Sequence, residues 1–272
     1  MPTKSFQHVD FAFIIPTYTN TSGLLRVLEN INQLYPKAHV VIINNDGSKR
    51  LEKKIDLKAY QFGLIVINNH MNVGYGKAIN DGSRQAKEAI NPKYLVFLND
   101  DVRFDKDWVL PCMRKLEKKK WIAAAPTLVS DKGTAENYGY RVLPYGKIEL
   151  IKDSIDGRPI DGLTAAALVF KQEDFFRLEG FDPIFFAYLE DVDLFLRAKK
   201  QGMRFGIVKE ITVMHGGQET SLKFPVKKAY LDFKNWIILI GKNWGFKKII
   251  LNFPSIFVER LRNLWGVVRS IF

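Results

Sequence analysis

The chain has 272 residues, a length that suits one large domain or one domain with an appendage. Its composition of 47% hydrophobic and 26% charged residues is that of a folded globular protein and excludes a disordered chain. The single cysteine, Cys112, excludes an internal disulfide framework and lacks partners at the spacing of a zinc site. The formal net charge of +12 calls for a negatively charged partner, such as nucleic acid, an anionic membrane surface or phosphorylated substrates.

The sequence contains no recognisable targeting or membrane-spanning segment. Residues 1–10 are polar, and the apolar run that follows, 11–15, is too short for a signal-peptide core and stops at Pro16. No run of 18 or more apolar residues occurs elsewhere. We therefore expect a protein of a reducing compartment without a spanning helix.

Short apolar runs alternate with helical patterns in the first half of the chain. The runs, which predict buried strands, are residues 11–15, 40–43, 64–67 and 94–98. Apolar residues from Leu24 to Leu34 recur at helical spacing behind the candidate caps Thr21 and Ser22, and a small-residue face predicts a second helix near 78–89. This alternation predicts a parallel, right-handed wound sheet.

Polar residues follow each of these strands, so Thr17, Asp46, Gly74 and Asp101 should meet on one rim of the sheet. Asn99, Asp100 and Asp101 end the fourth strand. Two carboxylates at such an edge suit Mg²⁺ or Mn²⁺ shared with a phosphate, although a solvated turn would have the same residues.

Glycine patterns give weaker information. Gly74-Tyr75-Gly76 lacks the third glycine of a dinucleotide fingerprint, because Ile79 stands in its place, and no phosphate-cradling P-loop sequence occurs. Gly74 therefore serves either a tight turn or ligand contact.

The second half predicts a basic helix over 108–120, a strand over 122–126 and an apolar strand over 163–170. Between the last two, residues 131–161 predict loops or a small hairpin able to cover the site.

Acidic residues recur at the start of a helix that begins at Glu190. Asp193 and Arg197 are spaced for an ion pair on an exposed helix face. Glu190 and Asp191 directly follow an aromatic stretch that should be partly buried, which makes them general-base candidates. His215, after another apolar segment, is either a structural histidine or a metal ligand.

Residues 223–272 carry ten basic side chains and two acidic ones, interleaved with large aromatic residues. Helices with this pattern suit either the surface of an anionic membrane or packing against the catalytic domain or a second subunit.

Several motifs, in order, resemble the family 2 glycosyltransferases over residues 11–217. They are Ile14 to Tyr18, Asn45 to Ser48, Asn72 to Gly74 continuing to Asn80, Asn99 to Asp101, Gly180 to Asp182 with Phe185 and Phe186, and Glu190 to Asp193. The sequence around Asp101 and around Asp191 is similar to that of bacterial rhamnosyltransferases and their relatives.

The resemblance implies a GT-A fold, a Rossmann-like and mainly parallel sheet flanked by helices, and a set of site residues. Asp101, Asp100 and His215 would hold Mg²⁺ or Mn²⁺, and Asp191 with Glu190 would supply the base. The residues implied for the nucleotide and donor are Pro16, Thr17, Tyr18, Asn45, Asp46, Asn72, Gly74, Lys77, Asn99 and Asp100. Asn45 stands where many members have aspartate, so either Asn45 or Asp46 would contact the nucleoside.

We therefore predict an inverting, metal-dependent glycosyltransferase domain over residues 1–222 and a helical extension over 223–272. The donor would be a nucleoside-diphosphate sugar, such as dTDP-rhamnose or a UDP-sugar, and the acceptor a glycan or lipid-linked hydroxyl in bacterial surface polysaccharide synthesis. The expected place is the cytoplasmic face of the cell membrane, with a homodimer as another use of the tail and no nucleic-acid partner. The alternatives are a sugar-nucleotide nucleotidyltransferase and a non-enzymatic basic module that binds membrane or nucleic acid.

Overall fold

A computed structural model describes residues 10–47, 51, 55–56, 59–130, 133–152, 159–216 and 225–269, without the side chains of 135–137 and 266–269. Ser48, Gly217 and Lys223 of the sequence motifs lie outside these residues. So do the predicted boundary between residues 222 and 223 and part of the lysine-rich segment before Tyr60.

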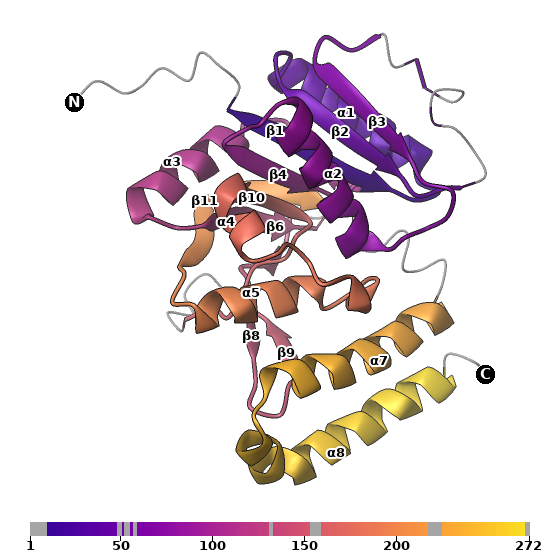
Figure 1. The fold of residues 1–272 in the computed structure, drawn as a ribbon, viewed down its shortest axis with the longest axis vertical. Coiled ribbons are helices and arrows are strands. Elements are labelled where there is room, and N and C mark those ends of the chain that lie inside the picture. Colours follow the sequence, from indigo (N-terminus) through magenta and orange to yellow (C-terminus); the bar gives the residue numbers. More distant parts are fainter. Residues whose placement is uncertain are drawn as a thin grey trace.

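A mixed β-sheet forms the centre of the described structure (Figure 1). Its order is β3-β2-β1-β4-β10-β6-β11-β5, with β7 paired to β6. The strands are β1 (Phe11–Thr17), β2 (His39–Asn44), β3 (Gly63–Asn68), β4 (Tyr94–Leu98), β5 (Val102–Arg103), β6 (Ala123–Val129), β7 (Ala135–Asn137), β10 (Ala167–Lys171) and β11 (Phe205–His215).

The first four strands in the sequence are parallel, as the alternation of strands and helices predicts. The other half differs, because β10 runs antiparallel to both β4 and β6. β10 is also shorter than predicted, since it begins at Ala167 and the residues from Leu163 to Ala166 lie outside it. β11 returns parallel to β6 and ends beside the two-residue β5.

Helices cover both faces of the sheet because its central strands are apolar on both sides. In β1, Phe13 and Ile15 face one core and Ala12 and Ile14 face the other. α1 (Thr21–Leu34) and α3 (Val109–Lys119) cover the first face, whereas α2 (Tyr75–Ala89), α4 (Gln172–Arg177) and α5 (Glu190–Lys200) cover the second.

Helices α2 and α1 can be compared with the sequence prediction in detail. The predicted small-residue face of α2 lies on the sheet, and a Cβ atom at Gly82 would come within 2.5 Å of Ile43. α1 is capped one residue earlier than predicted, since Asn20 rather than Thr21 or Ser22 accepts a hydrogen bond, from the Gly23 N–H.

A third, smaller core joins the C-terminal helices to the rest of the molecule. The predicted hairpin is present as β8 (Tyr140–Val142) and β9 (Ile148–Leu150). It packs with η3 (Pro183–Phe185), α5, α7 (Pro225–Asn243) and α8 (Phe246–Arg269) (Figure 1). Trp236 and Trp244 of this core donate indole hydrogen bonds to the carbonyls of Gly146 and Pro144 in the hairpin.

Candidate active site

The turn after β4 holds two aspartates in different environments. Val102 N–H donates to the Asn99 carbonyl across this tight turn. Asp100 faces back toward β1, where Thr17 Oγ1 donates to its Oδ2 at 2.7 Å and Asn20 Nδ2 to its Oδ1 at 3.2 Å. Burial, opposed by these hydrogen bonds, raises the pKa of Asp100 to about 7. Asp100 thus fixes the loop after β1, which contains Thr17 and Tyr18.

Asp101 faces the end of β11 instead. Pairing of β5 with β11 places Val102 opposite His215, and the Gly216 N–H donates to the Asp101 carbonyl. As a result, Asp101 Oδ1 lies 3.3 Å from His215 Nε2. Both side chains are more than four-fifths buried, and Asp101 Oδ1 accepts no hydrogen bond from the described residues.

These two groups fit a divalent cation that a substrate helps to bind. A carboxylate oxygen suits Mg²⁺ and Mn²⁺, and the separation of 3.3 Å is close to that of two ligands on one ion. In the described part of the chain no group of three or more His, Cys, Asp or Glu side chains could hold a metal. The remaining ligands would therefore have to come from the substrate or water, as is usual for Mg²⁺ bound with phosphates.

Asparagines pair at the ends of β2 and β3. Asn69 Nδ2 donates to Asn45 Oδ1 at 2.8 Å, and the Asn45 N–H donates to the Thr17 carbonyl. These bonds hold Asn45 between the end of β1 and the loop after β3. Asp46, the next residue, is partly exposed, and its N–H donates to Asn44 Oδ1. This placement favours Asp46 over Asn45 as the residue that contacts a nucleoside.

The entrance to α2 requires glycine. Asn72 Oδ1 accepts from the Gly74 N–H, and Gly74 has φ +87°, where other residues are strained. A Cβ atom there would also come within 2.3 Å of the Phe186 carbonyl oxygen. Lys77, one turn later, is exposed and pairs with Asp81 at 2.8 Å on the outer face of α2.

At the start of α5, Glu190 is buried and Asp191 is half-buried, in line with the partly buried position that the sequence predicts. Glu190 is 7% exposed, and its Oε2 has no hydrogen-bond partner among the described residues. Burial and the neighbouring Asp191 charge raise the pKa of Glu190. Burial also raises the pKa of Asp191, but N–H groups of Val192 and Ala165 stabilise its carboxylate and limit the rise. Asp191 is therefore the acid of the pair that ionises more readily.

A short backbone segment, Ala165 and Ala166, joins the two acidic centres. The Ala166 carbonyl accepts from the Asn99 N–H at the end of β4, and the Ala165 N–H donates to Asp191. The Ala165 carbonyl accepts from the Tyr75 hydroxyl at 2.9 Å. Burial, followed by the charges of Glu190, Asp191, Asp101 and Asp100, raises the pKa of Tyr75. Tyr75 thus lies within reach of both acid pairs, a role that its sequence position did not indicate.

The loop before α5 is strained and is held from α7. Phe186, Tyr188 and Leu189 all have positive φ, between 59° and 69°. The fully buried Asn235 directs its side-chain amide at three carbonyls of this loop, those of Phe185, Ala187 and Tyr188, at 2.7 to 2.8 Å. Sequence reasoning missed Asn235, because an asparagine in a helical pattern has no distinctive signal.

The predicted pair between Asp193 and Arg197 exists at 2.8 Å, but its predicted exposure is wrong. The Asp193 side chain is fully buried and also contacts Lys242 Nζ at 3.0 Å and Asn243 Nδ2 at 3.2 Å on α7. Docking of α7 on α5 covers a face that the isolated helix would expose to solvent.

Residues 12–178 match the sequence pattern of the family described as glycosyl transferase family 2, which covers more than half of the chain. The chain belongs to this family. A curated relative, the rhamnosyltransferase WbbL of Escherichia coli K12, is 26% identical over 256 residues, which are 88% of this chain and 94% of WbbL. The hexosyltransferase Agl10 of Haloferax volcanii, named for low-salt glycan biosynthesis, is 21% identical over 97% of this chain and 85% of its own.

Solved structures place this family 2 glycosyltransferase in the GT-A fold. The mannosyltransferase PcManGT of Pyrobaculum calidifontis, in complex with GDP-Man and Mn²⁺, has a TM-score of 0.62 at 16% identity and matches 95% of this chain and 72% of its own. GalNAc-T7, solved with UDP, GalNAc and Mn²⁺, has a TM-score of 0.65 at 15% identity. This chain matches with 87% of its residues and spans about half, 48%, of GalNAc-T7.

Proposed function

We propose that this glycosyltransferase transfers a sugar from a nucleoside-diphosphate donor to an acceptor hydroxyl with inversion, in a divalent-cation-dependent reaction. The observation that carries the proposal is the arrangement around Ala165 and Ala166. It connects the Asp101 and His215 pair, suited to a cation and diphosphate, with the buried carboxylate of Asp191. Family membership excludes the two alternatives from the sequence, a nucleotidyltransferase and a non-enzymatic binding module.

Two groups of residues would hold the donor. Asp46 after β2 would contact the nucleoside, and Thr17 and Tyr18, which hydrogen bonds to Asp100 hold in place, would line the same side together with Pro16 before them. Asp101 and His215 would hold Mg²⁺ or Mn²⁺, which when bound would neutralise charge on the diphosphate leaving group. Asn72 and Gly74 support the opposite wall, since they keep the start of α2 against the Phe186 carbonyl.

Asp191 would act as the base on the acceptor side. Its carboxylate takes the proton from an acceptor hydroxyl as the oxygen attacks the anomeric carbon, and the bond to the diphosphate breaks. Glu190, whose pKa is raised further because backbone groups stabilise it less, keeps its proton and leaves Asp191 as the single basic carboxylate. One displacement with one base inverts the anomeric centre.

The acceptor class we propose is a hydroxyl of a glycan or of a lipid-linked saccharide. Its support is the similarity to relatives named for rhamnosyl transfer and glycan biosynthesis. A panel of dTDP-rhamnose, UDP-sugars and GDP-mannose with Mg²⁺ or Mn²⁺ would identify the donor by release of the nucleoside diphosphate. Nuclear magnetic resonance of the product would show whether the anomeric configuration is inverted.

Two substitutions test the assigned roles. Asp191→Asn should lower transfer by about 10²-fold to 10⁴-fold, the usual contribution of a general base, and leave the donor Kd unchanged. Asp101→Asn should instead weaken donor binding only when the cation is present. Transfer at a near-normal rate by Asp191→Asn, or donor binding by the parent protein that ignores the cation, would contradict the mechanism. Glu173→Gln, at an exposed position of α4, is the control.

A further inference from the structure

α8 presents an apolar face that nothing in the described structure covers. Its large apolar residues with exposures of 46% to 79% are Phe246, Ile250, Leu251, Phe253, Phe257, Val258, Leu261, Leu264 and Trp265. The opposite side of the helix, with Ile249 and Ile256, packs into the third core against α7. α8 lies at the edge of the molecule (Figure 1). Its buried apolar residues form a side turned inward, and its exposed ones form a larger side turned outward.

The width of the outward face argues against a helix-to-helix seam. At 100° per residue, the positions from Phe253 to Leu251 span an arc of about 160°. A coiled-coil seam occupies only two positions per heptad, so a single partner helix would leave the side with Leu251, Val258 and Trp265 exposed. A planar apolar medium covers an arc of this width more completely than a second helix does.

The charge on the two C-terminal helices favours an anionic partner. Described side chains on α7 and α8 include eight bases and two acids, a net charge of +6. Lys247 and Arg262 are both exposed; at 100° per residue Arg262 borders the apolar arc, whereas Lys247 lies within it in the first turn of α8. On α8 itself the described side chains are four bases and one acid, a net charge of +3. A second copy of this chain would bring the same positive charge against this surface, whereas anionic lipid headgroups would be attracted to it.

No described helix is both long enough and apolar enough to cross a bilayer. A helix with one wide apolar face, terminal aromatic residues and flanking bases has instead the composition of an interfacial helix. Phe246 lies at the first position of α8 and Trp265 near its last described turn, and both are more than half exposed. Aromatic rings at both ends suit the level of the headgroups.

We propose that α8 binds the surface of an anionic phospholipid bilayer, with Phe253, Phe257 and Leu261 inserted among the acyl chains and Lys247 and Arg262 at the phosphates. The membrane proposal can be tested independently of the proposed function, because vesicle binding requires neither donor, cation nor acceptor. A chain that fails to transfer sugar can therefore still pass this test, and the reverse also holds.

Co-sedimentation of the full chain with vesicles measures the interaction directly. The chain should bind vesicles of phosphatidylcholine with phosphatidylglycerol and bind vesicles of phosphatidylcholine alone more weakly. Higher salt should weaken the binding to the anionic vesicles. Trp265 provides a second signal, since phospholipids with brominated acyl chains should quench its fluorescence, and Trp265→Phe should remove most of that quenching.

Matched substitutions separate the apolar face from general surface effects. Leu261→Ser should lower affinity for the anionic vesicles about tenfold. A change of this size is expected if at least about half of the leucine side chain leaves water when α8 binds the bilayer. Leu150→Ser on β9 is its control, because Leu150 and Leu261 have nearly equal exposures of 48% and 50%. Lys247→Gln should lower affinity about fivefold, whereas Lys118→Gln on the exposed side of α3 should not change it.

Three outcomes would overturn the proposal. They are absence of sedimentation with the anionic vesicles at low salt, an equal loss in Leu150→Ser and Leu261→Ser, and quenching that persists unchanged in Trp265→Phe. Light scattering that shows a dimer, converted to a monomer by Leu261→Ser without any vesicle binding, would assign the face to a second copy instead.

Discussion

At the scale of single residues, two acids that look alike in the sequence have different tasks. Asp100 and Asp101 are neighbours, yet Asp100 is bonded to Thr17 and Asn20 while Asp101 approaches His215. A turn of the chain separates a residue that orders a loop from one that can bind a cation. Asp191 differs from both, because burial raises its pKa while backbone N–H groups of Val192 and Ala165 stabilise its carboxylate.

The surroundings of Asp191 predict a displaced pH profile. In the proposed mechanism transfer requires its carboxylate, and burial raises the pKa of this group above the ordinary value of about 4. The carboxylate form is therefore lost at a higher pH than for an exposed aspartate. We expect the acid limb of kcat/KM to lie above pH 4, and activity to rise with pH through it.

The pH dependence of kcat/KM for Glu190→Gln provides the control. The Asp191 pKa shift arises from burial and backbone N–H groups, so Glu190→Gln should keep the limb at nearly the same pH. A limb at the ordinary value in the parent protein, or one that disappears in Glu190→Gln, would argue against Asp191 as the titrating base.

The sequence indicates these acids for a physical reason. Carboxylates directly after apolar runs must lie at the edge of a core, which explains why Asp101 and Asp191 could be predicted. Asn20, Tyr75 and Asn235 could not, because their contacts at the site are with partners from 47 to 90 residues away. Nothing in their local sequence indicates those partners.

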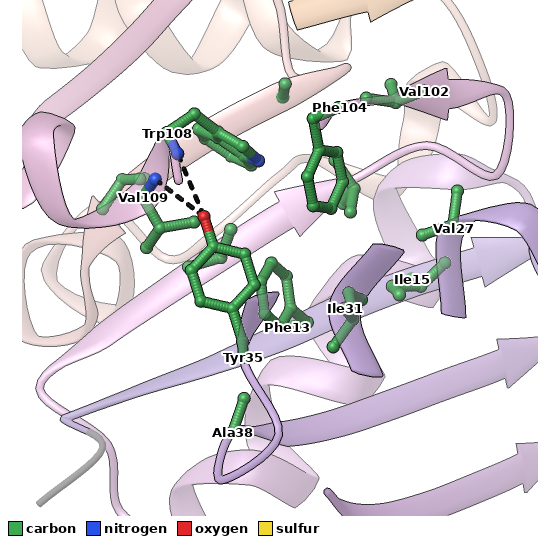
Figure 2. Packing of buried hydrophobic residues seen from close by; sticks show 14 of the residues in the cluster. Phe13, Ile15, Val27, Ile31, Tyr35, Ala38, Val102, Phe104, Trp108 and Val109 are labelled. Carbon is green, nitrogen blue, oxygen red and sulfur yellow. Dashed lines mark hydrogen bonds between the residues drawn. The ribbon is translucent and has the colours of Figure 1, made fainter. Parts of the chain in front are cut away.

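At the scale of secondary-structure elements, α3 is capped by a residue from another element. Its N-cap, Trp108, makes no side-chain capping bond. The Tyr35 hydroxyl accepts from the Trp108 and Val109 N–H groups at 3.0 and 3.3 Å, as Figure 2 shows, and donates to Asp107 at 2.7 Å. Burial and the nearby Asp107 charge raise the pKa of Tyr35, so it remains a neutral donor.

Tyr35→Phe should therefore lower the free energy of unfolding by about 1 to 3 kcal/mol, since buried N–H groups lose their acceptor. Urea denaturation would measure this difference. Tyr60→Phe is the control, because Tyr60 stacks on Phe62 and no described hydrogen bond involves its hydroxyl. Equal losses in the two variants would mean that the hydroxyl of Tyr35 does not stabilise α3.

The bond between α7 and the loop before α5 predicts a catalytic effect at a distance. Asn235→Asp replaces the donor amide by oxygen and leaves three carbonyls of the strained loop without their partner. The loop should relax and move Asp191, so kcat should fall tenfold or more. The donor Kd should change much less than kcat, since Asp101 lies in the turn after β4 and His215 at the end of β11, both outside this loop.

Steady-state kinetics and donor titration together distinguish this effect from simple destabilisation. Asn252→Asp is the matched control, because Asn252 bonds a single carbonyl on the exposed surface of α8. A fall in donor affinity equal to the fall in kcat would show that Asn235 supports the fold rather than the base.

At the scale of the whole molecule, the parallel half of the sheet followed directly from the sequence. Alternating apolar runs and helical patterns favour right-handed connections between parallel strands, so the parallel direction of β1 to β4 could be predicted from the sequence. The direction of β10 could not, since an apolar run is the same for either direction of the strand. Its antiparallel position inserts the Ala165 and Ala166 segment between the two acidic centres.

The division of the chain near residue 222 remains a prediction of the sequence. What the described residues show is extensive contact across it, since α7 bonds the hairpin, η3 and α5. The basic and aromatic pattern by which residues 223–272 differ from the rest of the sequence describes the outer surface of these helices. Their inner surface is part of the third core, and the pattern does not indicate it.

The bond from Asn235 to three carbonyls restricts how this protein can be recombined with its relatives. A C-terminal segment that only served for attachment could be exchanged as an independent module, with no consequence for turnover. Here the same helix that leads to the outer surface also carries the amide that holds the loop before Glu190. A chimera that takes its last two helices from another protein must therefore bring a side-chain amide to the position of Asn235, whatever surface it is meant to reach.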